Sequence, residues 1–103
     1  MYKLILTTTD SIQTVNTISD YLLNTKLSPC VQILNNLDSR YFWEGKIQSH
    51  NEYLLFIKCH KKDTSKISDY IKNNHNYEVA EIIETDLNIL NDRYKRWFDS
   101  ITN

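Results

Sequence analysis

The chain has 103 residues and a formal net charge of −1, from 12 basic and 13 acidic side chains. This length predicts a single domain over residues 1–103, and the balanced charge argues against nucleic-acid binding, which needs a strongly basic surface. The chain has one glycine, Gly45, which excludes P-loops, dinucleotide-binding loops and the G-x-S-x-G elbow, because each needs at least two glycines.

The first predicted strand covers residues 2–8, where the run Leu4-Ile5-Leu6 is typical of a strand covered on both faces. A helix should follow, because Asp10 and Gln13 have the spacing of an N-cap pair, and we expect it to end near Lys26. Its apolar stripe recurs every three or four residues, at Ile12, Val15, Ile18 and Leu22.

Further strand segments are predicted in the middle of the chain. Residues 30–37 alternate in polarity, with Asn35-Asn36 as a bulge or a turn, and residues 40–44 are rich in aromatic side chains. Gly45 marks a bend between this segment and the next. Residues 52–59 are the most apolar stretch of the chain and predict a central strand.

The last third of the chain predicts a helix over residues 63–74, a strand over residues 78–84 and a final helix that Asn91 caps. The complete order is that of the split βαβ arrangement. We therefore expect an α+β fold, a ferredoxin-like βαββαβ sandwich with an extra C-terminal helix. The apolar face of that last helix holds Tyr94, Trp97, Phe98 and Ile101.

Three consecutive aromatic residues, Tyr41, Phe42 and Trp43, lie in one predicted strand. Side chains alternate between the two faces of a strand, so at least one of these large rings points away from the helices of its own domain. A small monomer would expose that patch to water. The pattern therefore predicts oligomerisation through the sheet.

The soft metal ligands are scattered along the chain. Cys30, Cys59, His50, His60 and His75 have none of the spacings of a structural zinc site, and two cysteines are no disulfide framework. Each cysteine is interpreted either as a buried, inert thiol or as a ligand for a soft ion when several subunits pool their ligands. The N-terminus has too short an apolar run for a signal peptide or a membrane span, so we expect a cytoplasmic protein without membrane association.

A polar cluster follows the second predicted helix, where His75 lies beside Tyr77, Glu78 and Glu81. A histidine and two carboxylates near one turn can bind a divalent cation or transfer a proton. The alternative is a solvated loop with ordinary surface charges. No serine or cysteine has a base at a recognisable local spacing, so no enzymatic activity is expected.

The segment from Trp43 to Lys46 combines an aromatic ring, an acid, a bend and a base. It either lines a cleft, with Glu44 and Lys46 facing a polar ligand, or is a bent hairpin whose Trp43 packs on a neighbour. We favour the hairpin interpretation, because tryptophan is enriched at the centres of interfaces. The last helix, with Tyr94, Trp97 and Phe98, predicts a core or interface position rather than a base-stacking platform, because the net charge of −1 argues against binding of single-stranded nucleic acid.

Several segments together resemble the CutA divalent-cation-tolerance family, in the family's order and spacing. The most specific is Y-F-W-E-G-K-I at residues 41–47. The others are S-P-C-V-Q-I at 28–33, E-Y-L-L-F-I-K at 52–58 and H-N-Y-E-V-A-E-I at 75–82, with Asn91, Tyr94 and Trp97 in the last helix. The resemblance covers almost the whole chain.

The resemblance implies a ferredoxin-like core, a tight homotrimer with an architecture similar to the PII signalling proteins, and tolerance of copper and other divalent cations. Carried over to this chain, it implies Cys30 and His75 as soft ligands, with Glu78 and Glu81 as oxygen ligands. It also implies clefts or interfaces between subunits that involve Tyr41, Trp43, Glu44, Lys46, Lys58, Tyr77 and Trp97.

The chain also departs from the family pattern. Asn76 and Ala80 replace two prolines of the histidine segment, so that loop should be less pre-organised. Pro29 replaces a small residue before the family's cysteine, and Cys59 lies where a threonine or another small residue is common, so its thiol has no implied role.

These observations favour a homotrimer that binds copper or another divalent cation and takes part in the response to metal ions, with no organic cofactor. An alternative is a PII-like signalling trimer that binds a small anionic ligand or a partner protein in the clefts between subunits, where Lys46 and Lys58 would matter most. A third is a trimer that only scaffolds another, unidentified protein.

Overall fold

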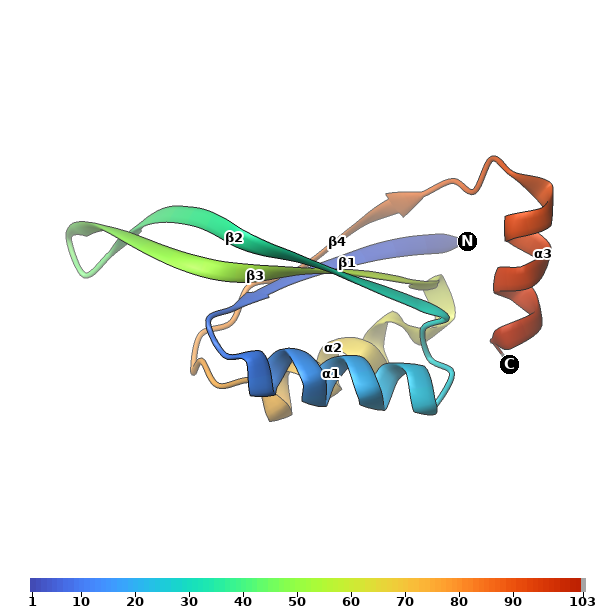
Figure 1. The fold of residues 1–103 in the computed structure, drawn as a ribbon, viewed down its shortest axis with the longest axis horizontal. Coiled ribbons are helices and arrows are strands. Elements are labelled where there is room, and N and C mark those ends of the chain that lie inside the picture. The colour runs from blue at the N-terminus through green and yellow to red at the C-terminus, as the bar shows by residue number, and fades with distance from the viewer. Residues whose placement is uncertain (103) are drawn as a thin grey trace.

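A computed structural model describes residues 1–102 of the chain as one four-stranded sheet with helices (Figure 1). The helices α1 and α2 cover one side of the sheet, and α3 lies at the end of the molecule opposite the long hairpin. None of the helices described is long and apolar enough to cross a membrane. The elements are β1 (Tyr2–Thr9), α1 (Ile12–Asn24), β2 (Cys30–Trp43), β3 (Lys46–His60), the 3-10 turn η1 (Lys61–Asp63), α2 (Thr64–Asn74), β4 (Ile82–Leu87) and α3 (Asp92–Ile101).

The strand order is β2-β3-β1-β4, and every neighbouring pair is antiparallel. The most apolar segment of the sequence, residues 52–59, is part of β3, which is a central strand as expected. The second central strand is β1. The α+β, ferredoxin-like arrangement with an additional C-terminal helix is confirmed.

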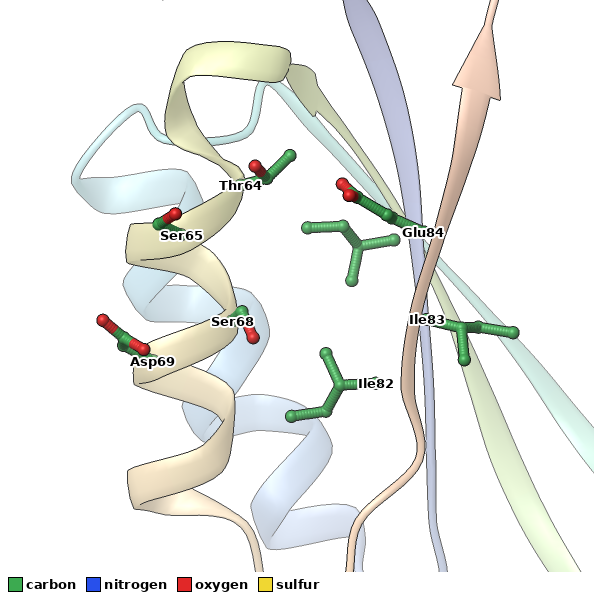
Figure 2. A pocket seen from close by; sticks show the side chains of 8 residues that line it. Thr64, Ser65, Ser68, Asp69, Ile82, Ile83 and Glu84 are labelled. Carbon is green, nitrogen blue, oxygen red and sulfur yellow. The ribbon is translucent and has the colours of Figure 1, made fainter.

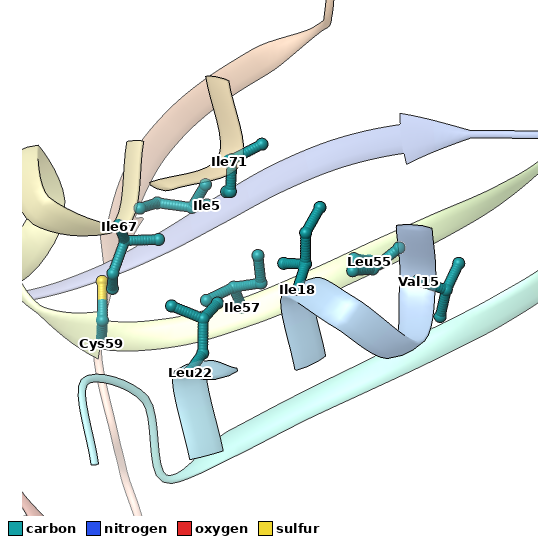
Figure 3. Close-up of a cluster of buried hydrophobic side chains, with 9 residues drawn as sticks. All are labelled: Ile5, Val15, Ile18, Leu22, Leu55, Ile57, Cys59, Ile67 and Ile71. Atoms are coloured by element: carbon teal, nitrogen blue, oxygen red, sulfur yellow. The ribbon is translucent and has the colours of Figure 1, made fainter. Parts of the chain in front are cut away.

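The hydrophobic core lies between the sheet and the two helices α1 and α2 (Figure 3). Strand residues of one parity face these helices, because side chains alternate across a sheet. Ile5 on β1 pairs with Ile57 on β3, and both point into the core. The helices supply residues at helical spacing. The core members are Ile5, Leu55, Ile57 and Cys59 from the sheet, Val15, Ile18 and Leu22 from α1, and Ile67 and Ile71 from α2.

The other face of the sheet, the open face, is not covered by α1 or α2. It presents Leu4 and Leu6, which are only half-buried, and Leu34 and Ile83, which are 52% and 51% exposed. The prediction that the Leu4-Ile5-Leu6 strand is covered on both faces is therefore wrong for the isolated chain. The chain exposes 6867 Å², against about 6,100 Å² expected for a monomer of this size.

The β2–β3 hairpin is longer and more continuous than the sequence suggested. The predicted segments merge into strands of 14 and 15 residues that project beyond the helices (Figure 1). The register shift between Leu34 and Leu37 confirms a bulge, in which Asn36 has a φ of 58°. At the tip, Glu44 and Gly45 have φ values of 50° and 77°, the pattern of a two-residue turn that suits the twist of a hairpin.

The start of α1 differs from the prediction, because Ser11 rather than Asp10 is the N-cap. The Ser11 hydroxyl accepts a hydrogen bond from the Thr14 N–H at 3.2 Å. Asp10 is instead engaged by Asn76, whose Nδ2 donates to Asp10 Oδ1 at 2.8 Å. The helix ends at Asn24, two residues before the predicted end, and Lys26 has a left-handed φ of 60°.

Strand β4 begins four residues later than predicted and extends to Leu87. Its ladder with β1 starts at the pair Ile82 and Thr7. The next carbonyl of β1, that of Thr8, is already bonded to the His75 ring at 2.8 Å, so the ladder does not continue in that direction. Residues 78–81 consequently form a loop beside the hairpin rather than a strand.

The C-terminal helix α3 packs over the end of the open face that contains Tyr2. Asn91 caps it as predicted, because Asn91 Oδ1 accepts a hydrogen bond from the Tyr94 N–H at 2.9 Å. Phe98 is fully buried, with its ring edge against the ring of Tyr2 at a centroid distance of 5.4 Å. The Tyr2 hydroxyl donates to Asp99 Oδ1 at 2.7 Å, so the first strand and the last helix hold each other.

Candidate functional site

A wide groove of about 1000 Å³ lies between one face of the β2–β3 hairpin and the loop after α2. Most of the hairpin residues share that face, because Tyr41 pairs with Gln48 and Ser39 pairs with His50, whereas Asp38 and Arg40 pair with Asn51 and Ser49 at positions of the opposite parity. The groove is therefore the outer continuation of the open face. Its lining residues are Thr8, Asp38, Ser39, Arg40, Tyr41, Trp43, Gln48, His50, Glu52, Asn76, Tyr77, Glu78, Val79, Ala80 and Glu81.

The floor of the groove holds a contact between Glu52 on β3 and Tyr77 in the loop. The Tyr77 hydroxyl donates to Glu52 Oε2 at 2.6 Å, and Glu52 is only 6% exposed. Burial and the neighbouring Glu52 carboxylate raise the pKa of Tyr77 well above its usual value. The phenol therefore keeps its proton and donates to Glu52 at physiological pH.

His75 anchors the loop through both ring nitrogens. The Tyr77 backbone N–H donates to His75 Nδ1 at 2.9 Å, so Nδ1 is the unprotonated nitrogen. Nε2 then carries the hydrogen and donates to the Thr8 carbonyl at 2.8 Å. The ring is thus a neutral imidazole with both nitrogens engaged, and it can bind a metal only by giving up one of these bonds.

Asn76 adds two further contacts between the loop and the end of β1. It bonds to the Thr9 hydroxyl and donates to Asp10 Oδ1. Asn76 is one of the two residues that replace prolines of the family pattern. Side-chain hydrogen bonds therefore hold the loop at the place where proline would restrict the backbone.

The hairpin wall of the groove also has internal partners. The Tyr41 hydroxyl bonds His50 Nδ1 at 2.9 Å. Arg40 Nη2 pairs with Asp38 Oδ2 at 2.9 Å, which holds the pKa of the Asp38 carboxyl below its usual value. Trp43 is 48% exposed. The positive charge of Arg40 is therefore already directed at a carboxylate of its own strand.

The groove is acidic. Four acidic residues, Asp38, Glu52, Glu78 and Glu81, are among its lining residues, with one basic residue, Arg40. Such a surface attracts cations and repels anions. Lys46 and Lys58, which the anionic-ligand alternative would need, do not line it.

The metal ligands expected from the sequence do not converge within one chain. Cys30 is on the open face, in register with Lys58 at the Leu4 end of the sheet, whereas His75 contacts Thr8 at the other end of β1. Glu78 and Glu81 line the groove. Within residues 1–102, no group of three or more histidines, cysteines and acids is arranged to hold a metal ion.

The residues expected at clefts or interfaces fall in two places. Tyr41, Trp43 and Tyr77 line the groove, and Glu44 and Lys46 are at the adjacent hairpin tip. Lys58 and Trp97 are at the other end, where Lys58 Nζ donates to the Tyr94 hydroxyl at 3.4 Å and Trp97 lies beside Tyr94.

The acidic, basic and histidine side chains of the groove that sequence reasoning did not assign to a site are those of Asp38, Arg40, His50 and Glu52. A signal existed for Glu52, because an acid at the start of an otherwise apolar strand is unusual when that strand is central. His50 and Asp38 carried no such signal, because they become neighbours of the loop only when the hairpin forms.

A second, smaller pocket lies between α2 and the edge strand β4, with a volume of about 310 Å³ (Figure 2). Thr64 and Glu84 point toward each other across it and Ile82 points into it, whereas Asp69 extends from the outer side of α2. The two carboxylates of this pocket, those of Asp69 and Glu84, therefore point in different directions. The groove is the stronger candidate site.

Comparison with known proteins gives a consistent result. Residues 3–100 match the family model of the CutA1 divalent ion tolerance protein. The divalent-cation tolerance protein CutA of Thermus thermophilus is 31% identical over 94% of this chain and 94% of its own length. A solved structure of the divalent cation tolerance protein Cut A1 from the same organism has a TM-score of 0.92 and 30% identity over 100% of both chains.

A plant relative, the chloroplastic protein CutA of Arabidopsis thaliana, is 33% identical over 82% of this chain. The match covers 47% of that relative, so the chain spans about half the length of the plant protein.

Proposed function

The chain belongs to the CutA1 divalent ion tolerance family, and on that premise we propose that it is a homotrimer that takes part in the response to divalent metal ions by binding them. The proposal that the ligand is a cation is supported by the excess of acidic over basic residues in the groove. An anionic ligand in the same groove would meet four carboxylates and one arginine that is already paired.

The trimer proposal is supported by the surfaces that one chain leaves uncovered. Leu34 and Ile83 on the open face are about half exposed. At the hairpin tip, Phe42 and Ile47 pair across the strands and are 71% and 75% exposed. Apolar surface on this scale is typical of a subunit interface. Association around a threefold axis would bury it while giving every subunit the same contacts.

The proposed ligands are Cys30, His75, Glu78 and Glu81, pooled between subunits. Pooling is required because Cys30 and His75 lie at opposite ends of the sheet in one chain. Copper is the proposed ion, since thiolate and imidazole suit copper, and the carboxylates can complete the coordination. His75 would join such a site by releasing either Tyr77 or Thr8.

Native mass spectrometry of the purified chain under reducing conditions, with and without copper, tests this function. We expect a threefold mass and a saturable number of copper additions that Cys30→Ser or His75→Ala reduces. Cys59→Ala is the matched control, because Cys59 has no exposed surface and should not affect copper binding. A single-chain mass, or copper binding that never saturates, would contradict the proposal.

A further inference from the structure

The C-terminal helix α3 is joined to the rest of the chain by an exposed segment and is held on the sheet by side-chain contacts. After β4 ends at Leu87, residues 88–91 form neither helix nor strand, and Leu90 is 91% exposed (Figure 1). The buried ring of Phe98 packs against the rings of Tyr2 and His60, at centroid distances of 5.4 Å to each. A helix of ten residues is marginal in water on its own, so these contacts largely decide whether α3 stays folded on the sheet.

The carboxylate of Asp99 on α3 faces two side chains of the sheet. The Tyr2 hydroxyl donates to Asp99 Oδ1 at 2.7 Å, and His60 Nε2 lies 3.4 Å from the same oxygen. That distance is longer than an ordinary N–H···O bond, so a neutral His60 ring adds little to the contact. A protonated ring would instead form an ion pair with the carboxylate. The His60 side chain is 15% exposed, so solvent protons reach the ring while screening of the pair is reduced.

The charges around His60 determine the sign of this effect. The titratable groups near its ring are Tyr2 from β1, Lys58 from β3, Lys61 and Lys62 from η1, Tyr94, Lys95 and Asp99 from α3, and the N-terminal amine of Met1, whose carbonyl accepts from the Lys61 N–H. Among these groups, only Asp99 is negative at neutral pH. The lysines oppose a further positive charge, so protonation of His60 is favoured by the presence of Asp99 beside it. A proton on His60 therefore stabilises the docked position of α3.

We propose that α3 is held on the sheet by a proton-dependent contact. When His60 is protonated, its ion pair with Asp99 adds to the hydrogen bond from Tyr2, and α3 is held firmly. When His60 is neutral, the ion pair is lost and α3 opens more often. Histidine is the side chain whose charge changes between about pH 5 and 8, so the docking weakens as the pH rises through that range.

The consequence of this contact is control over one end of the open face. Because α3 covers the end that contains Tyr2, the pH sets how often that end is uncovered. The inference goes beyond the proposed function and rests neither on the trimer nor on metal binding, since all of its groups belong to one chain and none is a proposed metal ligand.

Hydrogen exchange of the whole chain in its native assembly, measured by mass spectrometry at about pH 5.5 and about pH 7.5, tests the proposal. The rates are corrected for the intrinsic effect of pH on amide exchange, and peptides of α2 serve as the internal reference. We expect the protection of α3 peptides to fall about two- to fivefold between the two pH values, the size of effect that a partly exposed ion pair gives. High salt should reduce this fall, because it screens the pair.

His60→Gln is the decisive variant, because the amide still reaches toward Asp99 but never gains a proton. Its α3 peptides should have the same corrected protection at both pH values. His50→Gln makes the same chemical change on the hairpin, where the His50 ring bonds the Tyr41 hydroxyl, and should keep the native pH dependence.

Asp99→Asn tests the other partner of the contact, and it keeps the inference testable if His60→Gln does not fold, because the Asp99 side chain is 45% exposed. The amide still accepts the Tyr2 hydroxyl but carries no charge. The fall in α3 protection between the two pH values should therefore disappear or reverse.

Several outcomes would overturn the inference. These are equal corrected protection of α3 at both pH values in the native chain, or an undiminished pH dependence in either His60→Gln or Asp99→Asn. Saturable copper binding by a trimer whose α3 shows no pH dependence would overturn this inference and leave the proposed function in place. A pH-dependent α3 in a chain that neither trimerises nor binds copper would support the inference and contradict the proposed function.

Discussion

The two faces of the sheet differ in how much of their apolar surface the chain covers itself. On the helix-covered face, Ile5, Leu55 and Ile57 are buried under α1 and α2 (Figure 3). On the open face, Leu34 on β2 and Ile83 on β4 remain about half exposed.

The difference shows that the chain buries the apolar side chains of one face itself and leaves part of those on the other face in water. Burial of apolar side chains contributes about 25 cal/mol for each Å² removed from water, and on the first face the chain obtains this internally. On the open face, that stabilisation depends on other molecules. The groove, which continues this face, accordingly holds the charged and aromatic groups of the candidate site.

Placing a charge on the open face should have the largest effect. We expect Leu34→Lys to abolish the proposed trimer, because a lysine cannot be buried in an apolar interface without a partner. The single chain should still fold, since position 34 is 52% exposed. Native mass spectrometry measures the change, and Asn16→Lys on the exposed surface of α1 is the control. A persistent threefold mass in Leu34→Lys would show that the interface lies elsewhere.

Truncating one isoleucine of the core, Ile18 on α1, and one of the open face, Ile83 on β4, compares the contributions of the two sides of the sheet to stability. Ile18→Ala should lower the free energy of unfolding by about 2–5 kcal/mol, because Ile18 is fully buried in the core. Ile83→Ala should cost less than about 1 kcal/mol in the single chain, since half of its surface is already in water. Urea denaturation in the Leu34→Lys background measures both values without the contribution of assembly. Equal losses of unfolding free energy in Ile18→Ala and Ile83→Ala would contradict the view that the chain obtains its stability mainly from the helix-covered face.

The part of the open face under α3 should give a smaller, pH-dependent effect. Burial and the bond to Asp99 raise the pKa of Tyr2 above its value in the unfolded chain. A raised pKa means that this stabilisation is complete below about pH 10 and is lost as the pH rises through the folded-state value. Tyr2→Phe should therefore cost about 1–2 kcal/mol at pH 7 and make the alkaline loss of stability shallower. An unchanged alkaline profile would show that Tyr2 does not contribute to it.

Labelling the two thiols is the mildest comparison of the faces. Cys30 on the open face is half-buried, whereas Cys59 in the core is fully buried, and burial raises the pKa of its thiol to about 12. A thiol reagent should therefore modify Cys30 first in the native chain and Cys59 only when the chain unfolds. Mass spectrometry of the labelled protein identifies the site. Rapid native labelling of Cys59 would mean that the core opens readily.

Patterns within short segments predicted most of the fold correctly. Helical spacing correctly predicted that Val15, Ile18 and Leu22 of α1 are buried, although Ile12 at the start of the stripe is 50% exposed. The aromatic run at Tyr41–Trp43 correctly predicted a strand with uncovered rings. The errors fall at boundaries that distant residues decide. The Thr8 carbonyl bonds His75 and delays the start of β4, and Asn76 engages Asp10, leaving Ser11 as the N-cap.

The candidate site was predicted less completely. The sequence singled out Tyr77, Glu78 and Glu81, which do line the groove, but it grouped them with Cys30, which lies at the other end of the sheet. The family resemblance supplied that grouping. No pattern within a short segment could show how far Cys30 lies from Tyr77, Glu78 and Glu81 in the folded chain.

By itself, the sequence determined the kinds of elements and their order, because the periods of helices and strands can be recognised from residues close together in the chain. It also determined the family, through segments such as residues 41–47. Only the tertiary structure decided that Glu52 lies beneath Tyr77 and that both nitrogens of His75 are engaged. Those contacts join residues far apart in the chain, and their partners are fixed by strand register and loop path rather than by local preference.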